Sequence, residues 1–245
     1  MHFSAPPGTP RRLRAHILGA TALVAVVLPL AVLGAPASAG TVTAATVIKE
    51  AKAAIASESS AHVEFDAAST TSSSTEQFVA DVGASGGRET VTDGAAVLHV
   101  MVTPADGYIS GSASGLSLFG LTSAEATKVG KRWEFWKKGT KQYKNLESVV
   151  SVKSLESLLP ESKGTTLSTE GSDYVLTWTS AASGSTPKLS NTLSVAAKGT
   201  NLPVEETSTD SSGEKVTTTV SKWGEAIVVH APPASSTIAA ASVTG

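Results

Sequence analysis

The side chains that could support catalysis do not form a catalytic pattern in this sequence. His62, His99 and His230 lie far apart, and none has a second histidine or a cysteine at metal-ligand spacing. A surface histidine, or a core histidine with its hydrogen bonds satisfied, explains each of them. We therefore predict no metal site and no cofactor.

The serines and carboxylates lead to the same expectation. The segment Gly111–Gly115 reads GSASG, whereas a nucleophile elbow needs a serine at the central position, which is Ala113 here. Glu205 and Glu206 are neighbours on a predicted strand, so their side chains point to opposite faces. We expect no catalytic residues and no enzyme activity; an unrecognised hydrolase is the third and least favoured alternative.

A basic cluster is the most informative charged feature. Seven basic residues fall within a short stretch that contains one acid, Glu134: Lys128, Lys131, Arg132, Lys137, Lys138, Lys141 and Lys144. One interpretation is a solvated hairpin. The other is a docking patch for an anionic membrane surface or a wall polymer.

An apolar group lies just before this cluster, in a segment rich in glycine and serine. Its members are Leu116, Leu118, Phe119 and Leu121. They can plug the open end of a sheet as core, or they can line and gate an apolar cavity. The gate is slightly favoured, because a core plug would lie more naturally on a regular element.

The elements that must position these residues follow from periodicity. Apolar residues recur at three- and four-residue spacing in Val42–Ser57 and in Leu146–Leu159, which predicts two helices. Most of the remaining chain alternates apolar and polar residues between short turns, which predicts antiparallel strands, among them Ala226–Val229. No second sheet pattern is evident, so the helices must cover the apolar face. The predicted fold class is α+β, a curved antiparallel sheet with helices packed in its concave face.

Apolar strand positions on one face of this sheet could line a ligand cavity. They are Val63, Phe65, Phe78, Leu98, Val100, Tyr174, Leu176 and Trp178. The alternative is a filled core, which is the commoner state of such positions.

The N-terminus has the features of an export signal. Basic residues at positions 11, 12 and 14 precede an apolar run, and Ala37-Ser38-Ala39 fits the cleavage rule, with cleavage between Ala39 and Gly40. An uncleaved membrane anchor is the alternative. Residues 1–39 are therefore the predicted signal peptide, 40–233 the folded domain and 234–245 a flexible tail. The chain has no cysteine, so neither lipidation at the cleavage point nor disulfides are possible.

Composition narrows the set of partners. The chain after residue 39 carries 16 basic and 21 acidic residues, so its net charge is −5 and nucleic acid is not expected as a partner. The same segment contains 59 serines and threonines, a content that favours strands over a helical bundle. Oligomeric state is not readable from the sequence.

A set of short motifs, in order along most of the chain, resembles a known family. The motifs are Ser60-Ala61-His62, Asp106-Gly107-Tyr108, Ala126-Thr127-Lys128, Gly130-Lys131-Arg132-Trp133, Asn201-Leu202-Pro203-Val204, Trp223-Gly224-Glu225 and Ala231-Pro232-Pro233. Together they resemble the LppX/LprG-type lipid-carrier proteins of the LolA/LolB-like superfamily. That resemblance implies a half-barrel sheet around helices, an apolar cavity for acyl chains and no catalytic residues. The absence of a lipidated cysteine departs from the family pattern.

The sequence thus predicts a secreted, non-enzymatic protein of the cell envelope that binds or carries a lipid or lipid-linked molecule. The main alternative is an envelope-associated interaction or structural protein whose cavity is collapsed. Its basic hairpin would bind an anionic wall or membrane component.

Overall fold

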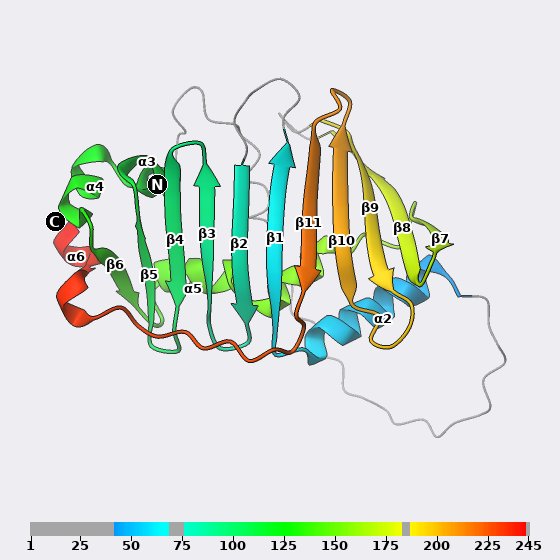
Figure 1. The fold of residues 1–245 in the computed structure, drawn as a ribbon, viewed down its shortest axis with the longest axis horizontal. Coiled ribbons are helices and arrows are strands. Elements are labelled where there is room, and N and C mark those ends of the chain that lie inside the picture. The colour runs from blue at the N-terminus through cyan, green and yellow to red at the C-terminus, as the bar shows by residue number, and fades with distance from the viewer. Residues whose placement is uncertain (1–41, 69–75, 183–186, 244–245) are drawn as a thin grey trace.

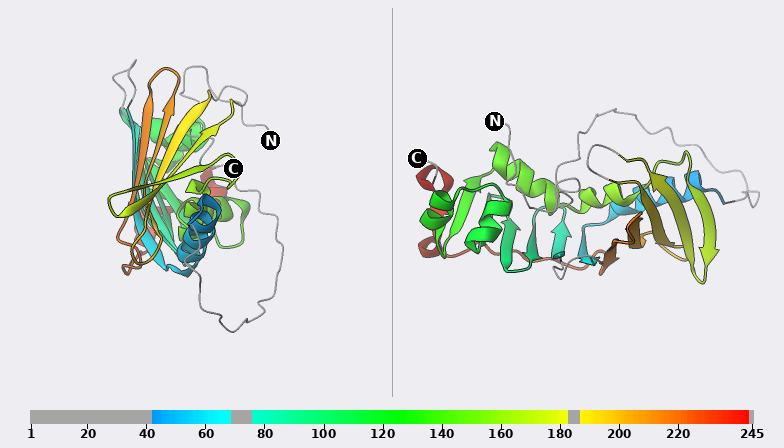
Figure 2. Two further views of the ribbon diagram at one scale, coloured as in Figure 1. Left: turned by 90° about the vertical axis from the view of Figure 1, so that its right-hand side faces the viewer. Right: turned by 90° about the horizontal axis from the view of Figure 1, so that it is seen from above.

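One open sheet of twelve strands forms the body of the protein (Figure 1). The computed structural model describes residues 42–68, 76–182 and 187–243. The strand order is β12-β6-β5-β4-β3-β2-β1-β11-β10-β9-β8-β7, so the sheet does not close. The sheet is curved, and helices α2 and α5 lie along the same side of it (Figure 2). The predicted α+β class, with a curved sheet and helices on one face, is confirmed.

All pairings in the sheet are antiparallel except that of β12 with β6, which is parallel. Strands β1 to β6 are successive neighbours, as are β7 to β11, and the pairing of β1 with β11 joins these two runs into one sheet. Their bounds are β1 Ser60–Ala68, β2 Glu76–Gly83, β3 Gly87–Asp93, β4 Ala96–Val102, β5 Asp106–Gly111, β6 Trp133–Lys137, β7 Thr166–Glu170, β8 Asp173–Ser180, β9 Leu189–Ala196, β10 Pro203–Asp210, β11 Lys215–Ser221 and β12 Thr237–Ala239. The helices are α2 Ala44–Ser57, α3 Ala113–Leu118, α4 Ser123–Val129, α5 Lys141–Val149, η1 Val152–Leu158, η2 Ala234–Ser236 and α6 Ala240–Val243. None of the described helices is long and apolar enough to cross a membrane.

The first predicted helix is confirmed as α2. The hydroxyl of Thr43 accepts a hydrogen bond from the Thr46 N–H at 3.2 Å, which caps the N-terminus. Val47, Ala51 and Ile55 recur every four residues and are fully buried. This stripe faces the sheet, as the periodicity predicts.

The second predicted helix, Leu146–Leu159, is replaced by two shorter elements, α5 and η1. Helix α5 begins at Lys141, because Thr140 caps it by accepting from the Tyr143 N–H at 3.2 Å. It then ends at Val149 instead of continuing to Leu159. The Val150 carbonyl accepts from the N–H of Gly83 at 3.0 Å, which turns the backbone out of the helix before η1 begins. The predicted continuous helix is therefore wrong.

Three other segments differ from the sequence expectation. The glycine-rich segment before Leu121 contains the short helix α3, whose cap is the Ser112 hydroxyl accepting from the Gly115 N–H. Residues 226–229, predicted as a strand, form no described strand. They belong to the segment that runs past the ends of the strands (Figure 1). The predicted flexible tail is ordered through residue 243: β12 pairs in parallel with β6, and Val243 is buried.

Two glycines let helix α5 and the turn after it lie close to the sheet. Gly87 pairs with Val102, and Val102 pairs with Gly107, so both glycines lie in one row across the strands. A Cβ at Gly107 would meet Leu146 Cδ1 at 2.9 Å. A Cβ at Gly87 would meet the backbone oxygens of Asp81 and Val150, the latter at 2.7 Å. The helical layer therefore rests directly on this row.

These two contacts generate a matched prediction. Gly87→Ala should lower the free energy of unfolding by about 1–3 kcal/mol, because backbone atoms must move to admit the methyl group. Gly107→Ala should cost clearly less, because the tip of a leucine side chain can rotate away. Urea denaturation of both variants measures the difference, and equal losses would contradict the proposed close contact at Gly87.

Candidate functional site

The predicted lining residues of the strands share one face of the sheet, which we call the inner face. All eight lie at alternate strand positions whose side chains point to this face. Five of them are buried: Val63, Phe65, Leu98, Val100 and Leu176. Phe78, Tyr174 and Trp178 are partly exposed. Phe65 and Phe78 stack with their ring centroids 4.5 Å apart. The alternation of the sequence thus located this face correctly.

The apolar residues of the inner face form three clusters instead of one core. The first lies under α3, α4 and α5 and includes Leu98 and Val100. The second lies under α2 and η1 and includes Val63. The third lies under α2 at the β8–β9 end and includes Leu176. We call the boundaries between neighbouring clusters seams: Phe78 spans the first seam, and Leu158 and Leu159 span the second.

The four apolar residues around α3 separate into two kinds. Leu116 is fully buried in the first cluster, so it acts as core. Leu118, Phe119 and Leu121 are partly exposed, and Phe119 lies 5.8 Å from Trp136 between ring centroids. A gate remains a prediction for these three side chains alone.

Sequence reasoning missed two buried carboxyls on the inner face. Glu89 on β3 is 7% exposed and Glu134 on β6 is 1% exposed. Glu89 has no hydrogen bond or ion pair with any residue that the structure describes, and Glu134 Oε2 likewise lacks a hydrogen-bond partner there. The alternation Gly87–Asp93 could have located Glu89, because it lies in phase with the apolar Val91.

Burial raises the pKa of both carboxyls. The pKa of Glu89 is raised to about 7 by desolvation. The pKa of Glu134 is raised to about 7 by desolvation and by the nearby charge of Glu125. Near neutral pH each carboxyl is therefore partly protonated, and no described basic residue forms an ion pair with it.

A third buried glutamate differs because its carboxyl is already occupied. Ser208 Oγ donates to Glu206 Oε1 at 2.5 Å and lies 2.7 Å from Asn191 Oδ1. Asn191 Nδ2 in turn donates to Ser180 Oγ at 2.9 Å. Desolvation raises the pKa of Glu206 and the Ser208 hydrogen bond partly offsets this. This chain of bonds joins β8, β9 and β10 and explains the burial of its polar members.

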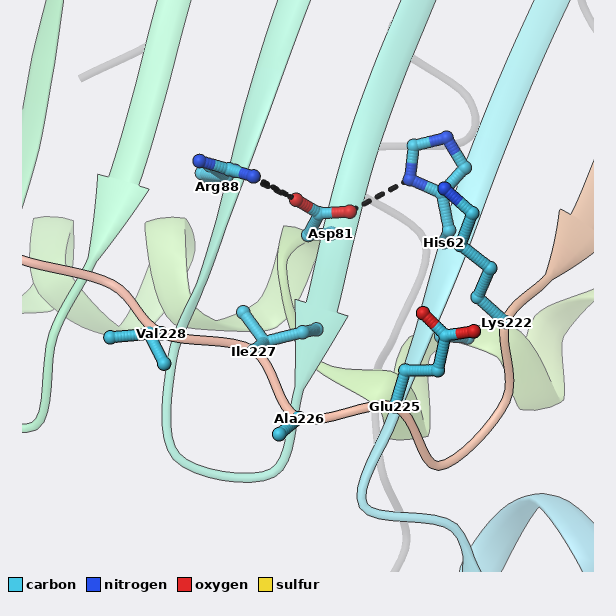
Figure 3. A pocket seen from close by; sticks show the side chains of 9 residues that line it. His62, Asp81, Arg88, Lys222, Glu225, Ala226, Ile227 and Val228 are labelled. Carbon is cyan, nitrogen blue, oxygen red and sulfur yellow. Dashed lines mark hydrogen bonds and ion pairs between the residues drawn. The ribbon is translucent and has the colours of Figure 1, made fainter.

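A polar pocket of about 220 Å³ lies near the ends of β1, β2 and β3, beside the C-terminal segment (Figure 3). Asp81 Oδ1 lies 2.7 Å from His62 Nδ1, and Arg88 Nε donates to Asp81 Oδ2 at 2.7 Å. Burial raises the pKa of Asp81, but the hydrogen bonds from His62 and Arg88 lower it on balance. Ile227 and Glu225 line the pocket from the C-terminal segment. These contacts tie three strands together.

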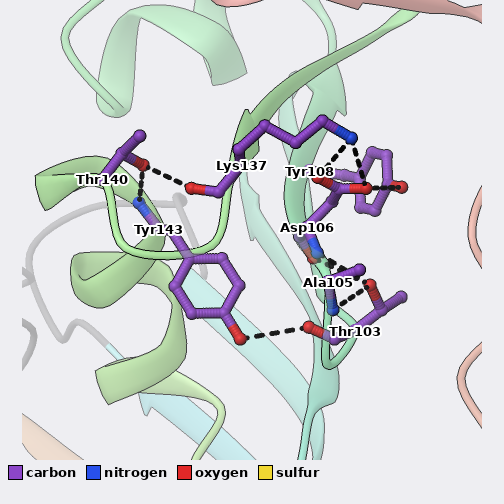
Figure 4. A network of polar contacts seen from close by, with 7 residues as sticks. All are labelled: Thr103, Ala105, Asp106, Tyr108, Lys137, Thr140 and Tyr143. Atoms are coloured by element: carbon purple, nitrogen blue, oxygen red, sulfur yellow. Dashed lines mark hydrogen bonds and ion pairs between the residues drawn. The ribbon is translucent and has the colours of Figure 1, made fainter.

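All seven residues of the predicted basic cluster are exposed, and several of them also make contacts within the protein. Lys128 Nζ donates to the Val243 carbonyl, and Arg132 donates to the carbonyls of Val129 and Lys128. Lys137 Nζ lies 3.0 Å from Asp106 Oδ1 (Figure 4). Lys131 is exposed at the opposite end of β6 from the remaining three. Lys138, Lys141 and Lys144 are exposed at the start of α5, beside the exposed Lys137.

The Asp106 turn fixes this corner of the fold. Tyr108 Oη donates to Asp106 Oδ2 at 3.3 Å, and Tyr143 Oη donates to the Thr103 carbonyl at 3.1 Å (Figure 4). Tyr143 is 2% exposed, so this bond anchors the first turn of α5 to the β4–β5 turn. The lysines on α5 therefore project from a rigid support.

No family model and no curated protein matches the chain. Among solved structures, lipoprotein LppX from Mycobacterium tuberculosis matches with 19% identity and a TM-score of 0.44 over 76% of this chain and 98% of its own. LprF from Mycobacterium bovis matches with 14% identity and a TM-score of 0.44 over 77% and 96%. A LolA superfamily protein from Nitrosomonas europaea matches with 10% identity and a TM-score of 0.32 over 77% and 96%.

These are the kinds of protein that the sequence motifs indicate. Identities and TM-scores this low say nothing about a ligand or an activity, so the support for a function has to come from this chain's own residues. Within the described ranges, no group of three or more histidine, aspartate or glutamate side chains could hold a metal ion. The absence of enzyme activity stays a prediction.

The raised pKa of Glu89 predicts a pH dependence of stability. Below its ordinary value of 4.5 the carboxyl is protonated in both folded and unfolded chains. Between 4.5 and about 7 only the folded chain keeps the proton, so this group makes the free energy of unfolding fall as pH rises. Glu89→Gln should remove the contribution of this group to the decrease in the free energy of unfolding, which is on the order of 3 kcal/mol at most.

Urea denaturation at pH 5 and pH 8 measures the effect. The exposed Glu205→Gln is the matched control and should retain the difference between the two pH values shown by the unmodified chain. If Glu89→Gln retains it as well, the carboxyl is ionised without cost in the folded protein.

Proposed function

We propose that this protein is an extracytoplasmic carrier that binds an apolar lipid against the inner face of its sheet. The observation that supports the proposal is the division of the inner face into three clusters whose seams are spanned by partly exposed side chains. A single filled core would bury such residues completely.

The seams have the chemistry that acyl chains need. Phe78 joins the first two clusters, and Leu158 and Leu159 join the second and third. Each methylene that leaves water contributes roughly 0.8 kcal/mol, so a chain that slips into such a seam gains affinity with length. The resemblance of the sequence motifs to lipid-carrier proteins points to the same class of ligand.

The first test is native mass spectrometry of the mature protein from its own host, together with organic extraction. A discrete added mass that extracts as lipid supports the carrier function and identifies the cargo. A protein that stays free of added mass, even after incubation with lipids, contradicts it.

A residue-level prediction concerns Phe78 and its neighbour. Phe78→Ser should weaken the affinity for a fluorescent fatty-acid probe by about tenfold or more, because burying a phenylalanine contributes roughly 1.5–3 kcal/mol. Val79 is the matched control: it is next along β2, on the opposite face, and 47% exposed. Val79→Ser should bind the probe as the unmodified chain does. Equal losses in both variants, with folding verified by circular dichroism, would place the lipid elsewhere.

The second candidate function is adhesion to an anionic surface through Lys138, Lys141 and Lys144. These side chains are exposed together on the rigid corner that Tyr143 anchors. Each lysine close to an anionic membrane contributes about 1 kcal/mol.

Replacing all three lysines by glutamate should abolish co-sedimentation with vesicles of anionic lipid. The same change at Lys163, Lys188 and Lys198, which are also exposed, should reduce it much less. Equal sedimentation with neutral and anionic vesicles would remove this function.

A further inference from the structure

The Glu89 carboxyl, at the seam between the first two apolar clusters, accepts no hydrogen bond from any residue that the structure describes. Across the strands it pairs with Ala80 on β2, which belongs to the second cluster, and with Val100 on β4, which belongs to the first. Phe78, the side chain that spans the seam, is the next inner-face residue on β2. The acceptor therefore lies where an apolar ligand would enter.

The row of Glu89 continues to a second acceptor. Val100 pairs with Ile109, and Ile109 pairs with Glu134. Three inter-strand spacings separate the two carboxyls, about 14 Å along the inner face. The residues between them are apolar and buried. This row is an apolar strip with a carboxyl at each end, and neither Glu89 nor Glu134 Oε2 has a hydrogen-bond partner among the described residues.

The strip has a helix on either side. On one side of the strip lies the row of Gly87 and Gly107, where the two glycines let α5 and the turn after it lie close to the sheet. At the other flank, a Cβ on Gly115 of α3 would meet the backbone of Val97 and Leu98. Glu89 lies between these supports and is 7% exposed.

A buried acceptor of this kind selects the polar group of its ligand. An unsatisfied carboxyl in an apolar setting costs stability, and a hydroxyl that donates to it removes that cost. No described basic side chain forms an ion pair with Glu89, so an anionic headgroup would find no positive charge bound there. An ammonium carries three donors and would bury most of them without acceptors.

We propose that Glu89 accepts a hydrogen bond from a hydroxyl group of the ligand, so that the site selects uncharged, hydroxyl-bearing lipids over fatty acids and phosphate-bearing lipids. Glu134 offers a second acceptor to a ligand whose hydroxyls span the strip. This assignment rests on the proposed lipid-binding function and adds the chemical class of the cargo.

The test compares three probes that share one acyl chain, 1-monooleoylglycerol, methyl oleate and oleic acid. Binding is measured at pH 8, above the raised pKa of Glu89, where its carboxyl is mostly ionised and can only accept hydrogen bonds. The unmodified chain should bind 1-monooleoylglycerol at least tenfold tighter than methyl oleate, and tighter than oleic acid. Glu89→Leu should bind the two uncharged probes equally while its affinity for methyl oleate stays the same. Glu89→Gln retains a carbonyl oxygen and should keep part of the preference.

Glu206 provides the matched control. It is 8% exposed and lies on the inner face, but its carboxyl already accepts from Ser208. Glu206→Leu should therefore keep the preference for 1-monooleoylglycerol. Circular dichroism of each variant verifies folding before binding is compared.

The outcomes separate the two claims. If the unmodified chain binds none of the probes, the lipid-binding function itself fails. If it binds methyl oleate and 1-monooleoylglycerol equally, or if Glu89→Leu keeps the preference, lipid binding stands and the role of Glu89 is overturned. Tighter binding of oleic acid, or of oleylamine as a cationic probe, would overturn the hydroxyl assignment.

Discussion

Backbone hydrogen bonds hold twelve strands in one open sheet, and the apolar side chains of its inner face then have to be covered by something other than a second sheet. The helices supply that cover, and every feature of the site follows from how they do so. Gly87 and Gly107 admit α5 and the turn after it to close contact, while the fully buried stripe of α2 covers the opposite end. Cover by separate helices leaves seams, which a closed barrel or a two-sheet sandwich would not have.

The seams connect packing to function. A side chain in the middle of a cluster is held by neighbours on all sides, whereas Phe78 is shared by two clusters that rest under different helices. Separation of those helices costs the contacts of a few side chains, not the hydrogen bonds of the sheet. Local opening of this kind requires far less free energy than unfolding. The sheet can thus stay rigid while the helices over the inner face separate.

Much of this arrangement could be predicted from the sequence, because periodicity records which face of an element is covered. The alternation around Val63 and Leu98 identified the inner face, and the stripe of α2 identified its cover. The end of α5 could not be predicted, because it depends on a hydrogen bond between Gly83 and Val150, which are far apart in the sequence. The parallel pairing of β12 with β6 is non-local for the same reason. Local patterns also gave no sign that Lys137 would form an ion pair with Asp106.

The buried glutamates show most clearly where pattern reasoning stops. Alternation places Glu89 on the inner face, but composition alone treats a glutamate as a surface residue. The structure separates two cases that the sequence cannot: Glu206 is held by Ser208, whereas Glu89 has no donor among the described residues. An apolar residue at Glu89 would satisfy the packing without the cost of desolvating a carboxyl. A position that keeps this cost, beside the seam that Phe78 spans, is more readily explained by a donor that arrives with the ligand than by the stability of the fold.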